Sequence, residues 1–296
     1  MILGTHINLS GANKKNGNSL SNSLIIAKDF LGSNALQIFT KSPIRYGSVK
    51  INAVDREEAK KYLKYNEIFL VIHGQYILNF CKKTEKVLWA IDSVVEDLIF
   101  LDILLEDNDS HLPSGVIIHM GKDTENLGKE ICMKNFAYAI SSVFNKISTN
   151  NHKVNLILET SVKSKNDMFY TIQDLSKLYN SLQENIRKRV KFCVDTCHIF
   201  ASGYNISQVD QMKKYFDDFD SEIGINNIIV IHLNDSKNKV NSGLDRHENI
   251  GDGHIFGENL DSLRYLLQLA EKNKIPVITE TPTKSPKKEL DFLRFI

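Results

Sequence analysis

The chain has 296 residues, 42% of them hydrophobic, and its 37 basic and 36 acidic side chains give a net charge of +1. This composition suits one large domain or two modest ones with an ample core. The near-zero net charge says nothing for or against a nucleic-acid partner, and any basic face must be a local patch. No apolar run approaches the ~18 residues of a membrane-spanning helix, which excludes a protein embedded in a membrane through helices.

Eight short apolar runs follow one another along the chain and are predicted to be β-strands. In chain order they are ILGTHIN near residue 2, ALQIFTK near residue 35, FLVIHG at 69–74, GVIIHMG at 115–121, VNLILETS at 154–161, VKFCVDTCH at 190–198, IIVIHLND at 228–235 and PVITETP at 276–282. Each is rich in Val, Ile and Leu, the composition of a strand that is buried on both faces.

The stretches between these runs are predicted to be helical. Residues 55–65 open on an acidic first turn and contain many good helix formers. Residues 84–105 place apolar side chains at i, i+3, i+4 and i+7, the stripe of a helix that lies on a sheet. Residues 170–186 and 259–272 show the same pattern. Only the segment 234–258 is long, polar and glycine-rich, and it follows the seventh run, where a barrel carries function rather than packing.

Strand and helix alternating eight times predict an α/β fold, the parallel (β/α)8 TIM barrel, with residues 1–296 forming one domain. No Pro/Gly/Ser-rich linker divides the chain. The alternative is a doubly wound open sheet, which places its site at one switch point of the strand order. Six consecutive runs carry polar residues at their ends here, and this favours the barrel.

Nine histidine and carboxylate side chains lie at the ends of the last six runs or just beyond them. They are His73, His119, Glu159, Asp195, His198, His232, Asp245, His247 and Glu280. Taken singly, each is more often a buried histidine, a helix cap or a loop charge than a metal ligand. Burying nine titratable groups at one barrel mouth is prohibitive, however, unless something ionic pairs with them. We therefore predict a metal site at the C-terminal ends of the strands, where barrel enzymes place their chemistry.

The mixture of imidazole and carboxylate donors suits Zn²⁺ and, less strongly, Mn²⁺ or Fe²⁺. One ion cannot use nine donors, whereas two or three ions sharing a bridging carboxylate can. Cys193 and Cys197 flank the same strand end as a CxxxC pair. We expect them to be two small buried residues rather than a redox couple.

The motifs at the run ends resemble those of endonuclease IV type apurinic/apyrimidinic (AP) endonucleases over essentially the whole chain. The matching stretches are GTHIN, IFTKSP, VIHGQYILNF, IIHMGK, ILETS, CVDTCHIFASGY, IHLNDSK, GLDRHENIGDGHIF and ITETP. The resemblance implies three Zn²⁺ ions, with Mn²⁺ or Fe²⁺ as alternatives at one position. It assigns His73, His119 and Glu159 to the first ion, Glu159 as a bridge with Asp195, His232 and Glu280 to the second, and His198, Asp245 and His247 to the third.

The resemblance also implies an activity in base excision repair. The substrate is duplex DNA with an abasic site, cut on the 5′ side to leave a 3′-hydroxyl and a 5′-deoxyribose phosphate. Removal of blocked 3′ ends is the expected second activity. Glu280 is the candidate to orient or deprotonate the attacking water besides ligating, and Glu159 is the second catalytic candidate, as the bridging carboxylate.

Two segments are candidates for contact with the lesion. Tyr76 and Ile77 match positions where the family inserts side chains, although ordinary packing explains such a pair equally well. The family also has an arginine soon after KSP that fills the gap in the base stack, but here Ile44 stands there and Arg45 follows. Either Arg45 takes that role with a changed loop, or Ile44 acts as an apolar wedge.

Lys237 and Arg246 lie beside ligand motifs and are candidates for phosphate contacts, although each can equally be a solvated loop charge. We expect a monomer, because nothing indicates oligomerisation. The N-terminus lacks a secretion signal and the four cysteines lack the spacing of a disulfide scaffold. We therefore expect an intracellular protein, cytoplasmic or, for a eukaryotic or viral source, nuclear, with no membrane partner.

Two other functions stay open at this point. A divalent-metal sugar isomerase or epimerase on the same barrel needs only Glu159, Asp195, His232 and Glu280, and does not need the remaining ligand set. A non-catalytic DNA- or metal-binding descendant of a nuclease is the other, although complete ligand sets argue against it.

Overall fold

The computed structural model describes residues 1–7, 9, 19–47, 51–106, 112–147, 154–257 and 260–296. Eight parallel strands form a closed barrel in the order β1-β10-β7-β6-β5-β4-β3-β2. Their bounds are β1 Leu3–His6, β2 Ala35–Ile38, β3 Phe69–His73, β4 Gly115–His119, β5 Asn155–Glu159, β6 Val190–Asp195, β7 Ile228–His232 and β10 Val277–Thr279. The predicted TIM barrel is thus confirmed, and the open sheet is wrong, because β1 pairs with both β2 and β10.

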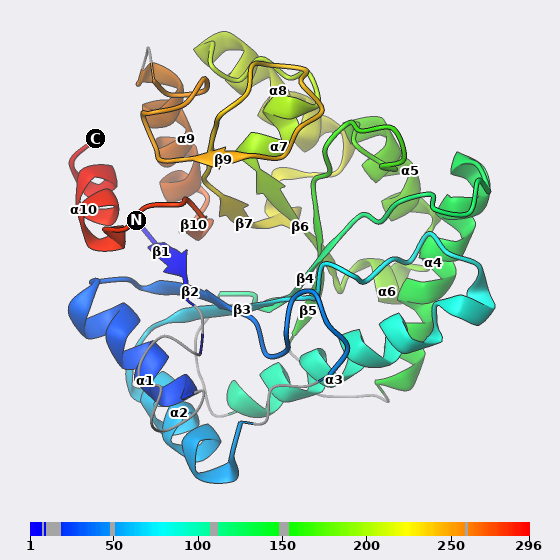
Figure 1. Ribbon diagram of the computed structural model, residues 1–296, viewed down its shortest axis with the longest axis horizontal. Coiled ribbons are helices and arrows are strands. Elements are labelled where there is room, and N and C mark those ends of the chain that lie inside the picture. Colours follow the sequence, from blue (N-terminus) through cyan, green and yellow to red (C-terminus); the bar gives the residue numbers. More distant parts are fainter. Residues whose placement is uncertain (8, 10–18, 48–50, 107–111, 148–153, 258–259) are drawn as a thin grey trace.

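Helices surround the barrel, as Figure 1 shows. They are α1 Leu20–Ile25, the π-helix η2 Ile26–Phe30, α2 Ala53–Tyr65, the 3-10 helix η3 Thr84–Lys86, α3 Leu88–Leu104, α4 Lys129–Lys146, α5 Ile172–Ser181, α6 Glu184–Arg187, α7 Thr196–Ala201, α8 Val209–Glu222, the 3-10 helix η4 Ile225–Asn227, α9 Asp261–Lys272 and α10 Pro286–Phe295. No helix in the described ranges has the length and apolar character needed to cross a membrane.

The helices predicted at 55–65 and 84–105 correspond to α2 and to η3 with α3. The prediction of one helix over 170–186 is wrong, because the chain forms α5 and α6 separately. Leu182 between them has extended backbone (φ −78°, ψ 146°) and a buried side chain, so burial of Leu182 accompanies the break. The last predicted helix corresponds to α9, and residues 258–259, which end the polar segment and begin that prediction, lie outside the described ranges.

Alternation along the strands explains how the barrel interior is filled. A small apolar cluster occupies the interior and includes Val71, Ile117, Ile157, Val230 and Ile278. Successive side chains of a strand point to opposite faces, so a residue two positions further on points inward as well. The residues at these next inward positions are His73, His119, Glu159, His232 and Glu280. The predicted donors therefore form the polar layer directly above an apolar plug.

The polar segment after β7 is fastened to the barrel by one buried carboxylate. Asp235 lies in β8 (Asp235–Ser236), which pairs antiparallel with β9 (His247–Glu248). Its side chain accepts hydrogen bonds from the backbone N–H groups of Gly251 at 3.0 Å, Gly253 at 3.2 Å and Ile255 at 2.8 Å. This anchoring places β9, and with it His247, over the mouth.

Candidate metal centre

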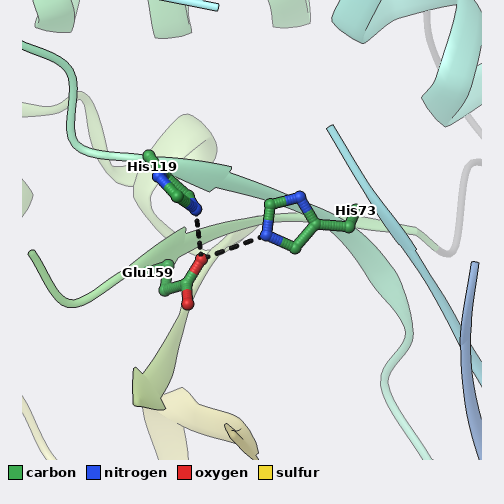
Figure 2. A group of neighbouring side chains, drawn as sticks. All are labelled: His73, His119 and Glu159. Carbon is green, nitrogen blue, oxygen red and sulfur yellow. Dashed lines mark hydrogen bonds and ion pairs between the residues drawn. The ribbon is translucent and has the colours of Figure 1, made fainter. Parts of the chain in front are cut away.

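The first donor group joins three neighbouring strands. His73 ends β3, His119 ends β4 and Glu159 ends β5, and their donor atoms lie within 4.8 Å of one another. Glu159 Oε2 is 3.3 Å from His73 Nε2 and 3.1 Å from His119 Nε2, so both imidazoles point at one oxygen (Figure 2). His73 Nδ1 lies 2.7 Å from the carbonyl oxygen of Gly74, which fixes the ring.

The second donor group shares Glu159 with the first. Its donor atoms come from Glu159, Asp195, His232 and Glu280, again within 4.8 Å of one another. His232 Nδ1 is central: it lies 2.9 Å from Glu159 Oε1, 3.2 Å from Glu280 Oε2 and 3.8 Å from Asp195 Oδ2. The two oxygens of Glu159 therefore face different groups, which is the arrangement of a bridging carboxylate.

The third donor group combines His198, Asp245 and His247. Asp195 caps α7 by accepting a hydrogen bond from the backbone N–H of His198 at 2.9 Å, and this places the imidazole one turn beyond β6. His198 Nε2 is 3.2 Å from Asp245 Oδ2, and His247 Nε2 is 3.1 Å from Asp245 Oδ1. The loop fastened by Asp235 thus supplies two of these three donors.

Two amide side chains that the sequence analysis missed hold the donors in place. Gln37 on β2 lies with Oε1 2.7 Å from His232 Nε2, and its Nε2 donates to Glu280 Oε1 at 2.6 Å. Asn234 donates to Asp195 Oδ2 at 2.7 Å and accepts from the backbone N–H of Glu280 at 2.9 Å. Both amides are fully buried. In the sequence, the sign that could have identified them is a single amide residue inside an apolar run (Gln37) or just after one (Asn234).

The ionisation of the centre is governed by competition between burial and opposite charge. Burial raises the pKa of Glu159, but His119 and His232 outweigh it and hold that pKa well below its usual range. Burial likewise raises the pKa of Glu280, and His232 lowers it to about 2. Burial lowers the pKa of His247, yet Asp245 raises it to about 9. In the metal-free protein these shifts favour the anionic forms of Glu159 and Glu280 and the protonated, positively charged form of His247.

The donor set fits divalent metal ions. Imidazole nitrogens and carboxylate oxygens are the ligand types that Zn²⁺ takes in proteins. Among the described donor groups one buried atom is left without a hydrogen bond: His247 Nε2 approaches Asp245 Oδ1 at 3.1 Å without hydrogen-bonding geometry. Two ligands of a common cation approach each other in this way. We therefore take the three groups as candidate metal sites, and the assignment of individual ions stays a prediction.

The predicted lesion contacts lie on the same rim. Tyr76 is half-exposed, and its ring centroid lies 5.4 Å from that of His73 and 5.5 Å from that of His119. Burial raises the pKa of Tyr76 well above its usual value, with Glu280 adding to the effect, so the phenol keeps its proton. Ile77 is only partly buried.

The loop after β2 carries the other two candidates, Ile44 and Arg45, and both side chains are exposed. Gln75 holds this loop against the end of β3. Its Nε2 donates to the carbonyl oxygens of Ser42 at 2.8 Å and Arg45 at 2.5 Å. Its Oε1 accepts from Ser93 Oγ at 3.0 Å. Because Gln75 follows His73 by two residues, one short segment connects the first donor group to the loop, and sequence reasoning did not find this clamp.

Lys237 directly follows β8 and Arg246 directly precedes β9. The backbone N–H of Lys237 donates to the carbonyl oxygen of Arg246 at 2.9 Å, and both side chains are exposed. Arg246 lines a cavity together with His119, His198 and Asp245. Cys193 and Cys197 are buried and unbridged, and burial raises the pKa of both thiols to about 12. The sulfur atom of Cys193 lies within 4.8 Å of donor atoms of Glu159 and His232, and that of Cys197 within 4.8 Å of donor atoms of Asp195 and His247.

Comparisons with known proteins agree with this geometry. The profile of the xylose isomerase-like TIM barrel family matches residues 26–295. Putative endonuclease 4 of Acanthamoeba polyphaga mimivirus is 35% identical over 256 residues, 85% of this chain and 78% of its own length. Probable endonuclease 4 of Staphylococcus carnosus is 27% identical over 283 residues, 95% of this chain and 88% of its own.

Among solved structures, endonuclease IV from Thermus thermophilus superposes with a TM-score of 0.80 at 20% identity, covering 100% of this chain and 98% of that one. At this identity the superposition shows a shared fold. The family match and the viral relative carry the assignment further. The chain belongs to the xylose isomerase-like TIM barrel family and, within it, to the endonuclease IV group.

Proposed function

We propose that residues 1–296 form a single-domain AP endonuclease that hydrolyses the phosphodiester 5′ to an abasic site in duplex DNA. The products are a 3′-hydroxyl and a 5′-deoxyribose phosphate, and blocked 3′ ends are a second substrate. Three Zn²⁺ ions serve the reaction, and the protein works as an intracellular monomer in base excision repair. The observation that carries this proposal is the convergence of three donor groups, two of them sharing Glu159, at one barrel mouth.

The donor groups divide naturally among three ions. His73, His119 and Glu159 would hold the first, Glu159 with Asp195, His232 and Glu280 the second, and His198, Asp245 and His247 the third. When bound, such ions acidify water and offset the negative charge that develops on a phosphoryl group during hydrolysis. A phosphodiester needs both effects at neutral pH, and no serine or cysteine nucleophile is required.

Glu280 is the residue best placed to orient the attacking water. Gln37 donates to one oxygen of its carboxylate at 2.6 Å, and Asn234 approaches the other at 3.4 Å. A carboxylate fixed in this way keeps further lone pairs that can accept a hydrogen bond from water, and its orientation is set by the two amides. Replacing Glu280 by Gln should therefore greatly reduce cleavage and leave DNA binding largely intact.

Recognition of the lesion is assigned to the rim beside the first donor group. Tyr76 presents a phenol next to His73 and His119, and the loop held by Gln75 presents Ile44 and Arg45. An abasic sugar has no base to unstack, so its extrusion from the duplex costs less than that of a paired nucleotide. The mouth can then select the lesion partly through this difference.

The sugar isomerase reading has one observation in its favour, because the second donor group alone contains the carboxylate and imidazole set that such enzymes need. It gives no role to the third group. His198, Asp245 and His247 lie on α7 and the anchored loop rather than at strand ends. Their convergence favours phosphodiester hydrolysis.

The deciding experiment is cleavage of an end-labelled duplex with one tetrahydrofuran abasic analogue by the zinc-loaded protein. The analogue cannot undergo β-elimination, so only a hydrolytic nuclease cuts it. We expect one cut 5′ to the analogue, lost in His198→Ala and kept in His254→Ala, an exposed histidine outside the donor groups. A duplex with a 3′-phosphate tests end trimming in parallel. An uncut duplex, with zinc shown to be bound, would overturn the proposal and lead to a screen of ketoses.

A further inference from the structure

Two adjoining cavities extend from the third donor group along the rim of the barrel. The inner one, of about 290 Å³, is lined by His119, His198 and Asp245 and reaches Lys122 and Arg246. The outer one, of about 470 Å³, is lined by Lys129, Lys163, Lys165 and Tyr170. Ser164 and Asp167 line both cavities. They therefore form one depression, here called the basic groove, that starts at the metal centre.

The floor of the basic groove is built before any ligand arrives. The loop after β4 and the loop after β5 are joined by an antiparallel bridge between Lys122 and Asp167. A hydrogen bond of 2.8 Å from the backbone N–H of Asp123 to the carbonyl oxygen of Asn166 strengthens this connection. The backbone N–H of Lys163 donates to Ser202 Oγ at 2.8 Å, which ties the second loop to the end of α7.

The loop that carries Asp245 forms a further wall of the basic groove and packs closely against the loop after β5. Gly243 has a φ of +68°, and a Cβ atom at this position would lie 2.7 Å from the carbonyl oxygen of Lys163. Only glycine allows the loop that carries Asp245 to approach so near. The groove is thus a preformed feature of three loops, and a ligand that enters it meets little ordering penalty from the protein backbone.

The basic groove carries a larger excess of positive charge than the molecule as a whole. Its lining holds five basic side chains, Lys122, Lys129, Lys163, Lys165 and Arg246, against the two carboxylates of Asp167 and Asp245. The whole chain carries a net charge of only +1. Asp245 belongs to the third donor group, so its charge is directed at the metal centre and leaves a strongly positive groove.

Lys129 Nζ is paired with Asp174 at 2.5 Å, whereas the positive charges of Lys122, Lys163 and Lys165 are available to a ligand. Lys122 contacts Asp167 at 3.3 Å, yet its side chain is 60% exposed, and Asp167 also accepts from Ser164 Oγ. The only contact of Lys163 Nζ is a long one of 3.5 Å to Asn241 Oδ1 within the described ranges. In the same ranges Lys165 has neither a hydrogen bond nor an ion pair, and it is exposed.

We propose that the basic groove binds the phosphate backbone of the substrate duplex on one side of the reacting phosphate, with Lys163 and Lys165 as its main contacts. This inference rests on the proposed function and deepens it by naming where the strand leaves the metal centre. Lysine side chains and hydroxyls suit phosphate oxygens and read no base sequence. The groove therefore contributes affinity and register rather than recognition of the lesion.

Binding to an undamaged duplex, which is not cut, tests the groove apart from catalysis. Lys163→Glu/Lys165→Glu is compared with wild type by fluorescence anisotropy over a range of salt concentrations. Each phosphate contact contributes about 0.9 to the slope of log K against log salt. We expect the slope to fall by about one to two and the affinity at low salt to fall at least tenfold.

The matched control is Lys188→Glu/Lys272→Glu, which changes the net charge equally. Both residues are exposed and precede β6 and β10, at the opposite end of the barrel. The control variant should bind the undamaged duplex with the wild-type slope of log K against log salt. Equal losses in both double variants, or a wild-type slope in the groove variant, would overturn the proposal. The neutral double variant Lys163→Gln/Lys165→Gln removes the two charges without reversing them. Circular dichroism of each protein shows whether a change in binding arises from misfolding.

Cleavage of the tetrahydrofuran duplex separates this proposal from the proposed function. If wild type leaves that duplex uncut while the lysine-dependent slope persists, the nuclease assignment fails and the groove stands. If wild type cuts it and the slope is independent of both lysines, the groove fails and the nuclease assignment stands.

Discussion

Glu159→Gln is expected to remove two of the three zinc ions proposed above, whereas Asp245→Asn is expected to remove one. Glu159 is shared by two donor groups, and Asp245 belongs only to the third of the proposed ion sites. Glutamine keeps the shape of the side chain and removes its charge. Oxygens of this 1% exposed carboxylate lie 2.9 to 3.3 Å from imidazole nitrogens of His73, His119 and His232.

The size of the loss in zinc affinity follows from the burial of the Glu159 carboxylate. Removing one partner of a buried ion pair costs about 3–5 kcal/mol, and about 1.4 kcal/mol corresponds to a tenfold change in affinity. Each proposed ion site that contains Glu159 should therefore bind zinc about 10² to 4 × 10³-fold more weakly.

The assay is zinc per protein by mass spectrometry after dialysis against a weak chelator, with circular dichroism to confirm folding. Glu130→Gln provides a matched control, because that glutamate is 70% exposed on α4 and belongs to none of the donor groups. The reasoning is refuted if Glu159→Gln retains as much zinc as wild type. It is refuted equally if Asp245→Asn loses as much zinc as Glu159→Gln.

Three further outcomes are expected. Gln75→Glu places a carboxylate oxygen against the carbonyl oxygens of Ser42 and Arg45. The loss of about one hydrogen bond, about 1 kcal/mol, should raise the KM for the abasic duplex at least about fivefold at unchanged zinc content. An unchanged KM in steady-state kinetics would contradict the role of Gln75 in holding the loop. Arg45→Ala should weaken binding to abasic DNA more than to intact DNA, and equal effects in anisotropy titrations would remove Arg45 from lesion recognition. In chelator-treated protein the pKa of His247 is raised to about 9, above about 6.5 for a free histidine, so its ion pair stabilises the fold fully below pH 6.5 and is lost as the pH rises through 9. The Tm of the wild type should therefore fall over this pH range, and the Tm of His247→Gln should fall by less. Parallel curves of Tm against pH for the two proteins would exclude this contribution.

Periodicity explains why so much of the barrel and its donors could be predicted from the sequence. A buried parallel strand appears as a continuous apolar run, and six such runs end on a histidine or carboxylate. Closure of the barrel turns those ends toward one another, and the structure brings the nine predicted donors into three groups. Which ion each group holds stays a prediction.

The supporting residues could not be predicted because their signal is weak in one dimension. Gln37 is a single polar residue in an apolar run, and its partners His232 and Glu280 are 195 and 243 residues away. Gln75 likewise acts through carbonyl oxygens that leave no trace in the sequence. The break between α5 and α6 was missed because apolar spacing continues through Leu182 although its backbone is extended.

The apolar plug beneath the donor layer determines how the centre exchanges with solution. Ile117, Ile157 and Val230 fill the barrel interior below the donors, so ions can enter and leave only through the mouth. In the proposed function a bound duplex would cover that same opening. Metal loss should therefore slow when substrate is present, and the protein should hold its ions most firmly while it is engaged on damaged DNA, even where free zinc is scarce.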